Sequence, residues 1–341
     1  MLASPGHHEC RAGLDLSLPL GTHEVSTITR SSMPKEPVGV GRFAIGRGYA
    51  GLMAVGSQLS QLEGYPFEVR YSDGALARAR AAADVAADAY VYFSRLFSAV
   101  EPDIAVIVAD ETDWSGKLPY GLPFFRDDTD EIRPGIVVMP AGGGNFWIEI
   151  ARDLRNASPR GYEKLLATYP DGAGGLDLQP FFDLVTIHEL GHAFEVLGDL
   201  RLPTFWLSEI FVNLAMHAFV ATQLPASLPT LEVLSTVGAG SRKLAARMRA
   251  EGYSTLEELQ AHYTGSDDSM SPLNYVWFQY RWQRLAAEMF EVDGEDGLVR
   301  FWDCFQSRDR VNASEATAAS LAPLLAIEVS EILGGAVRDW H

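Results

Sequence analysis

The chain has 341 residues, of which 47% are hydrophobic and 11% aromatic, enough for the core of one large domain or two smaller ones. Its formal net charge of −18 argues against a nucleic-acid backbone or an anionic lipid surface as a partner, because both are bound through excess Lys and Arg. Its two cysteines lie far apart, and the N-terminus lacks a basic segment followed by an apolar run. We therefore expect a cytoplasmic protein with no nucleic-acid and no membrane partner.

Residues 1–59 mix Ser, Pro, Gly and His with little periodicity, which predicts a partly disordered N-terminal extension ahead of a folded domain at 60–341. In the first half of that domain, short apolar or alternating runs predict strands, and one Ala-rich run predicts a long helix. The predicted strands are residues 67–71, 104–108 and 135–139, and the predicted helix is residues 75–100.

After residue 160 the pattern becomes helical. Pro180 opens a helix that ends at Leu197, before Gly198, and a second helix follows at about 204–223. Further helices are predicted at residues 227–250, 255–263, 272–291 and 295–306, with a final pair beyond residue 312. Strands that precede helices, without βαβ alternation or an internal repeat, predict an α+β fold.

The motif His188-Glu189-Leu190-Gly191-His192 lies within the first of these helices. Positions four residues apart share a helix face, so both imidazoles can bind one Zn²⁺ ion. Glu189 is displaced by about 100° around the axis from His188, which suits a base that acts on a metal-bound water. The alternative is a pair of histidines spaced by chance. The motif predicts a zinc site with His188 and His192 as ligands and Glu189 as the catalytic base.

Catalytic zinc usually has three protein ligands, and more than one residue could supply the third. A metzincin would need Gly at 195 and His at 198, but the chain has Glu195 and Gly198. Asp199 follows the helix closely, although the residues around it lack the pattern of aspartate-ligated zincins. Glu209 is the better candidate, because it lies at the start of the next helix in the sequence FWLSEIFVN.

Together, HELGH and WLSEIFVN resemble the gluzincin metallopeptidases, in particular the catalytic domains of aminopeptidase N-type and thermolysin-like peptidases. The resemblance implies a zincin-like catalytic domain over residues 60–341, with a small N-terminal mixed sheet, an active-site helix and a mainly helical C-terminal part. It assigns Glu209 as the third ligand, although 16 residues separate it from His192, a slightly short spacer. Asn213 falls where thermolysin-like members have an acid that orients the first histidine, here His188.

In this family, an edge strand upstream of the motif pairs with the substrate backbone. The segment GIVVMPAGGGNFW at 135–147 is expected to take that place, the alternative being an ordinary glycine-rich turn. Gly144 stands where aminopeptidase N-type enzymes have the glutamate that holds the substrate's amino group, while Asn145 matches their asparagine. Aminopeptidase specificity is therefore not expected.

The resemblance also implies a tyrosine or histidine downstream that donates to the developing oxyanion. The segment 274–285 is similar to the family's YxKGA helix, without its Lys-Gly pair, and aligns Tyr275 with the tyrosine. Tyr280 and His262 are alternatives, and aromatic residues on a helix are more often packing residues.

The implied function is zinc-dependent hydrolysis of peptide bonds in a peptide or protein substrate. In that mechanism Glu189 activates the water and Tyr275 stabilises the oxyanion. The alternatives are a catalytically silent zincin-like module that binds a peptide or partner, and hydrolysis of a bond other than a peptide bond.

Overall fold

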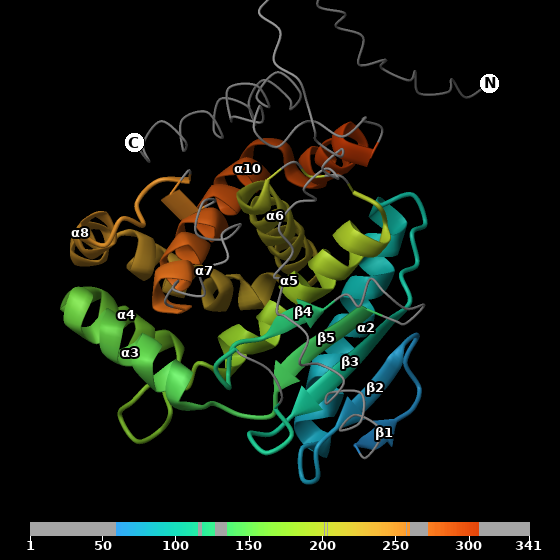
Figure 1. Ribbon diagram of the computed structural model, residues 1–341, viewed down its shortest axis with the longest axis horizontal. Helices are drawn as coiled ribbons and strands as arrows, with labels where there is room; N and C mark the ends of the chain where they lie inside the picture. The colour runs from blue at the N-terminus through green and yellow to red at the C-terminus, as the bar shows by residue number, and fades with distance from the viewer. Residues whose placement is uncertain are drawn as a thin grey trace, which may run out of the picture. The chain divides into compact units, whose positions relative to one another are not determined.

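Five strands form one mixed sheet in the order β1-β2-β3-β5-β4 (Figure 1). In its centre β2, β3 and β5 run parallel, while β1 and β4 pair antiparallel at the two edges. The predicted strands are confirmed as β2, β3 and β5, and the three-residue strands β1 and β4 are additional. The strands are β1 (Ser60–Leu62), β2 (Glu68–Tyr71), β3 (Ile104–Ala109), β4 (Phe124–Arg126) and β5 (Gly135–Pro140).

The computed structural model describes most of the predicted domain. Three predicted parts lie outside the described residues. They are the extension up to residue 58, most of the predicted helix 255–263, and the predicted helices beyond residue 312. The described residues are 59–114, 118–126, 135–200, 202, 204–256, 258–259 and 272–306.

The central strands are buried because both faces of the sheet are covered. Every residue of β3 and β5 is buried, as expected for apolar parallel strands without a solvent face. On one face, the long helix α2 (Leu76–Leu96) packs on β2 and β3, and α5 (Gln179–Leu197) packs on β4 and β5. These two helices also contact each other, so α5 is held between the sheet and the helices that follow.

The expectation of a chain without a βαβ unit is wrong at one place. β2 and β3 are parallel and α2 connects them, which makes one βαβ unit. The unit is hard to recognise in the sequence because β2 has four residues, only one of them fully buried. The α+β fold class is nevertheless confirmed, since the remaining strands are followed by a mainly helical C-terminal part.

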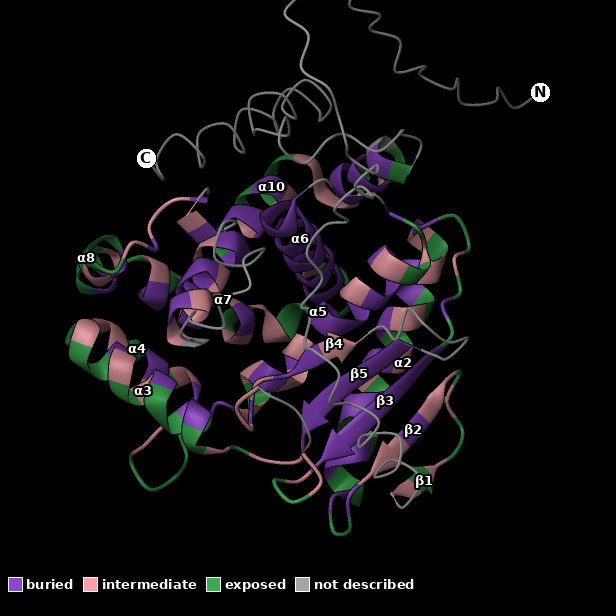
Figure 2. Ribbon diagram, in the orientation of Figure 1, coloured by how far each residue is buried: buried purple, intermediate pink, exposed green. Residues whose placement is uncertain are grey.

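The helical part surrounds α6 (Phe205–Gln223), in which all residues but the last three are buried (Figure 2). α6 is long and apolar enough to cross a membrane by length and composition, but 89% of that apolar window is buried inside the protein. The other helices are α3 (Asn145–Ala157), α4 (Pro159–Thr168), η1 (Pro225–Ser227), α7 (Leu228–Ala239), α8 (Arg242–Ala250) and α10 (Pro272–Gln306).

Two of these helices differ from the predicted boundaries for identifiable reasons. The predicted helix 227–250 is interrupted, because Gly240 ends α7 and the Ser241 hydroxyl accepts from Leu244 N–H to begin α8. The predicted helices 272–291 and 295–306 are one element, α10, broken only at Gly294, whose φ of 59° and ψ of −146° are not helical. Across the core, Trp302 of α10 stacks on Phe97 after α2 at 4.3 Å between ring centroids.

Candidate metal centre

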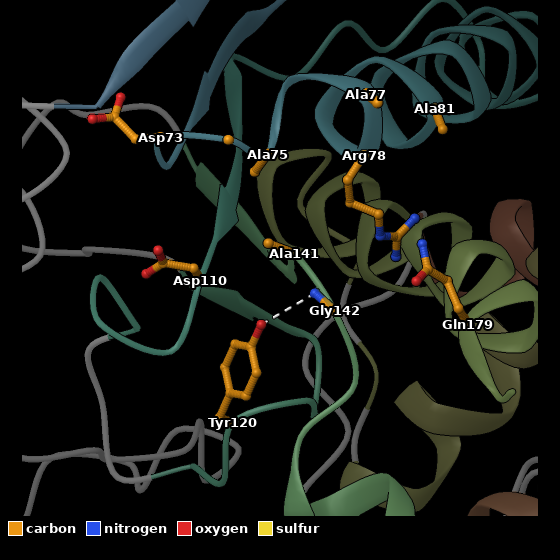
Figure 3. A pocket seen from close by; sticks show the side chains of 11 residues that line it. Asp73, Ala75, Ala77, Arg78, Ala81, Asp110, Tyr120, Ala141, Gly142 and Gln179 are labelled. Atoms are coloured by element: carbon orange, nitrogen blue, oxygen red, sulfur yellow. Dashed lines mark hydrogen bonds between the residues drawn. The ribbon is translucent and has the colours of Figure 1, made fainter.

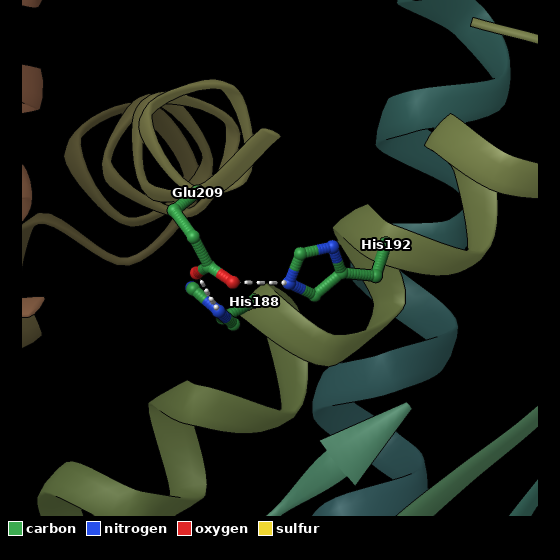
Figure 4. A group of neighbouring side chains, drawn as sticks. All are labelled: His188, His192 and Glu209. Atoms are coloured by element: carbon green, nitrogen blue, oxygen red, sulfur yellow. Dashed lines mark ion pairs between the residues drawn. The ribbon is translucent and has the colours of Figure 1, made fainter. Parts of the chain in front are cut away.

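Helices α5 and α6 bring together three side chains that could hold a metal ion. His188 and His192 lie one turn apart on α5, with ring centroids 5.0 Å apart, and Glu209 reaches them from the first turns of α6 (Figure 4). A ligand atom from each of the three lies within 4.8 Å of the others. Gly191 permits this approach of the two helices, because a Cβ there would lie 3.1 Å from Cβ of Val212 on α6.

Both oxygens of Glu209 face the imidazoles. Its Oε2 lies 3.3 Å from Nε2 of His188, and its Oε1 lies 3.6 Å from Nε2 of His192. Of the two candidates for a third ligand, Glu209 is therefore the one that joins the group. Asp199 is exposed, in the left-handed backbone conformation just after α5 with φ of 57°. Glu209 is only 2% exposed, so its charge needs partners within the protein.

The ring of His192 is fixed from behind by Glu195. Nδ1 of His192 lies 3.0 Å from Oε2 of Glu195, and the Ser208 hydroxyl donates to the same oxygen at 2.6 Å. A carboxylate on Nδ1 favours the tautomer that carries its proton there, which leaves the Nε2 lone pair toward Glu209. This role of Glu195 was not predicted from the sequence. Its signal was the spacing of three from His192, which places it one turn further along α5.

Glu209 is held in turn by α10. Tyr275 donates from its hydroxyl to Oε1 of Glu209 at 3.0 Å, and Gln279 donates from Nε2 to Oε2 at 2.6 Å. Asn213, expected to orient His188, makes its recorded hydrogen bonds to the Glu209 carbonyl oxygen at 2.7 Å and to Oε1 of Gln279 at 2.9 Å. Gln279 is a further residue of the site that the sequence analysis missed.

The charges of the group are complementary. Burial opposes ionisation of Glu209, but His192 and His188 outweigh it and hold the pKa of this carboxyl well below its usual range. Burial alone would lower the pKa of His192, yet Glu209 and Glu195 together raise it well above its ordinary value. The Glu209 carboxylate thus favours positive charge on the His192 imidazole. Two imidazole nitrogens and one carboxylate are also the donor set of a catalytic zinc site, so these residues fit a divalent metal ion.

Glu189 lies beside the two histidines and Glu209 and also reaches the edge strand β4. It is 7% exposed, and burial raises the pKa of its carboxyl, although His188 and His192 act in the opposite direction. A hydrogen bond with the backbone of Phe125 connects it to β4. Glu189 is thus a carboxyl with a raised pKa beside the two histidines that could hold a metal ion.

The strand that borders the site is not the one expected from the sequence. β5, the first half of the segment 135–147, lies inside the sheet between β3 and β4, and its edge neighbour is β4. The second half is not strand either, because Asn145 begins α3 directly after Gly144. The short sequence of β4, Phe-Phe-Arg, gave too little alternation to be recognised as a strand.

The two tyrosines considered as oxyanion donors point to different neighbours. Tyr275 contacts Glu209, as described above, whereas Tyr280 packs where a Cβ at Gly238 of α7 would overlap its ring. Burial raises the pKa of Tyr280, with further contributions from Asp153 and Tyr169 in the same direction. Tyr280 therefore lies among the packing residues between α7 and α10. His262 lies outside the described residues.

A separate cavity of about 650 Å³ opens at the carboxyl ends of β2, β3 and β5 (Figure 3). Asp73, Asp110 and Arg78 are the charged residues of its lining, and Arg78 is ion-paired with Asp183 of α5 and donates from Nε to the Pro140 carbonyl oxygen. The Tyr120 hydroxyl there accepts from Gly142 N–H at 3.1 Å. None of the three metal-binding side chains lines this cavity. Among the described residues, the group that could hold a metal ion is His188, His192 and Glu209, away from this cavity.

No protein-family model, curated protein or solved structure matches this chain. The buried triad is consistent with an HExxH...E zincin site on the geometry alone.

Proposed function

We propose that the protein is a zinc metallopeptidase of the gluzincin type, in which His188, His192 and Glu209 hold Zn²⁺. The observation that carries the proposal is the convergence of these three side chains within 4.8 Å, with Glu189 beside them. A purely structural zinc site closes its coordination with four protein ligands. Here, among the described residues, the group has three, which leaves a position for water and substrate.

A zinc ion held by these residues supplies Lewis-acid activation of water and of the substrate carbonyl. Glu189 takes the proton of the attacking water and delivers it to the leaving amine. Its raised pKa supports this role, because a base that must also release the proton works best with a pKa near the working pH.

The hydroxyl of Tyr275 is the proposed donor to the oxyanion. Its oxygen lies 3.0 Å from Oε1 of Glu209, so with substrate bound the hydroxyl would turn its single proton from this carboxylate to the oxyanion. Removing one such donor from hydrolases costs about 100- to 1,000-fold in turnover.

The proposed substrate is an extended peptide or protein segment. β4 is the last strand of the sheet order, and the outer side of an edge strand can form backbone hydrogen bonds with an added chain. Glu189 contacts Phe125 of this strand, so a peptide paired along it would pass the general base. The net charge of −18 favours a peptide over nucleic acid or an anionic membrane, and we place the activity in the cytoplasm.

The test is a comparison of the zinc-loaded protein with Glu189→Gln on a diverse peptide library, with products identified by mass spectrometry. We expect cleavage by the wild type and a loss of at least about 100-fold in the variant, the usual contribution of a general base. Zinc content should be equal in both, because Glu189 is not a ligand.

Equal cleavage by both proteins would show that Glu189 is not the base. Absence of cleavage by either, with one zinc bound to each, would favour the alternative of a zincin-like module that binds a peptide or partner without turnover. Absence of zinc from the wild type would contradict the metal site itself.

A further inference from the structure

Helices α6 and α10 share a row of polar side chains inside an otherwise apolar contact, which we call the α6–α10 polar seam. On each helix its members are spaced four residues apart, so they meet turn by turn. Four members are buried and two, Tyr275 and Gln279, are half-buried. Polar groups withdrawn from water are costly unless they are hydrogen-bonded, so these members need partners across the seam. The seam consists of Glu209, Asn213 and His217 on α6 and Tyr275, Gln279 and Gln283 on α10.

Gln279 is the branch point of this seam. Its amide nitrogen donates to Oε2 of Glu209 at 2.6 Å and to the hydroxyl oxygen of Tyr275 at 2.6 Å. Its Oε1 accepts from Nδ2 of Asn213 at 2.9 Å. Both amide protons and the carbonyl oxygen therefore have partners, which is a complete use of the side chain.

The chemistry of the partners permits a single orientation of the Gln279 amide. Rotating it by 180° would turn Oε1 toward the Glu209 carboxylate, which can only accept, and would set the amide nitrogen against the Asn213 amine. The orientation of Gln279 also sets that of Tyr275. Since the tyrosine oxygen accepts from Gln279, its own proton is directed to Oε1 of Glu209. One amide thus fixes the positions of both carboxylate oxygens.

We propose that Gln279 is a positioning residue of the metal centre, which holds Glu209 in the orientation that binds zinc and holds the Tyr275 hydroxyl beside it. This inference rests on the proposed zinc site. Hydrogen bonds to a ligating carboxylate raise metal affinity by restricting the ligand, and their loss typically costs 10- to 100-fold. Gln279 would therefore act on the metal through Glu209, without being a ligand itself.

The experiment measures zinc affinity by chelator competition in the full-length wild type and in Gln279→Met, which keeps the length of the side chain but removes both donors. We expect a 10- to 100-fold weaker affinity in the variant. We also expect an altered visible spectrum after loading with Co²⁺, because the spectrum reports how the ligands are arranged around the ion. Gln283→Met is the matched control, since it lies one turn further along α10 and contacts His217 at 3.3 Å. Its affinity and spectrum should equal those of the wild type.

Asn213→Ala provides a second test that leaves Gln279 in place. It should weaken zinc binding in the wild-type background and have little further effect in Gln279→Met, because the two residues act on Glu209 in series. An affinity and spectrum unchanged by Gln279→Met would overturn the inference while leaving the zinc site intact. A wild type that binds no zinc would instead contradict the proposed function. Equal losses in Gln279→Met and Gln283→Met would show a general packing effect and would also overturn the inference.

Discussion

The two ends of the α6–α10 polar seam contain the same kinds of groups but differ in charge. At the metal end, Glu209 lies against two imidazoles and receives hydrogen bonds from Tyr275 and Gln279. At the far end, the polar partner of His217 across the seam is the amide of Gln283. The ring of Phe290 packs against that of His217, with 5.3 Å between ring centroids. Both ends are buried between the same two helices.

The pKa values of two histidines show the effect of this difference in charge. Glu209 and Glu195 raise the pKa of His192 despite burial, whereas burial without a nearby carboxylate lowers the pKa of His217 to about 4. A buried histidine is therefore neutral and structural where its neighbours are amides and aromatic rings, and attracts a cation where carboxylates converge on it. The carboxylates that converge on His192 therefore make the metal end a candidate site.

The largest expected effect comes from removing the carboxylate at the metal end. Glu209→Ala should lower zinc affinity by more than about 100-fold, beyond the cost of losing an outer partner, because it deletes a proposed ligand. His217→Ala removes a polar side chain at the far end and should leave zinc affinity unchanged. Chelator competition on both variants measures this, and similar losses in the two would remove the distinction between the ends of the seam.

The sequence was informative about this site where a short helical spacing carries the chemistry. His188 and His192 were predicted because a four-residue spacing on one helix requires no knowledge of the fold. Glu209 required a family resemblance in addition, since its position depends on how α5 and α6 pack. Gln279 lies 70 residues from Glu209 and has no motif of its own, so its role depends on packing that sequence periodicity does not specify.

The fold shows the same limit. The long buried strands β3 and β5 and the helices α2, α5 and α6 were predicted, because their apolar patterns extend over whole elements. β1 and β4 were not, since three residues give no usable period, and β4 is the strand that borders the site. The order of the strands could not be predicted from the sequence either. β5 was therefore expected at the edge of the sheet, which β4 occupies.

An intermediate effect is expected at the partner of His192. Glu195→Ala removes the acceptor on Nδ1, 3.0 Å away, and should lower zinc affinity by about 10- to 100-fold. Ser208→Ala removes only the hydroxyl that donates to Glu195 at 2.6 Å, so its loss should be smaller. Titration of both variants with zinc in the presence of a chelator gives the ranking. If Ser208→Ala were the more damaging variant, the carboxylate would not be what orients His192.

The smallest effect is expected at the far end and concerns pH. The unfolded chain binds a proton on His217 near its ordinary pKa of 6.5, while the folded protein does so only near pH 4. Between these values the unfolded state binds more protons, so stability falls as pH falls through this window. The pKa difference predicts a loss of about 1 kcal/mol in the free energy of unfolding between pH 7 and pH 5.5 from this residue.

His217→Gln removes this titration and keeps a polar group facing Gln283. The free energy of unfolding of the metal-free wild type and variant is measured by urea denaturation at pH 7 and pH 5.5. Every other ionisable group is common to the two proteins, so its contribution cancels in the difference, and the variant should lose about 1 kcal/mol less than the wild type. Parallel pH dependence would mean that His217 takes up its proton in the folded state as readily as in the unfolded state. The far end would then hold a charge, and the absence of a carboxylate would no longer explain why it differs from the metal end.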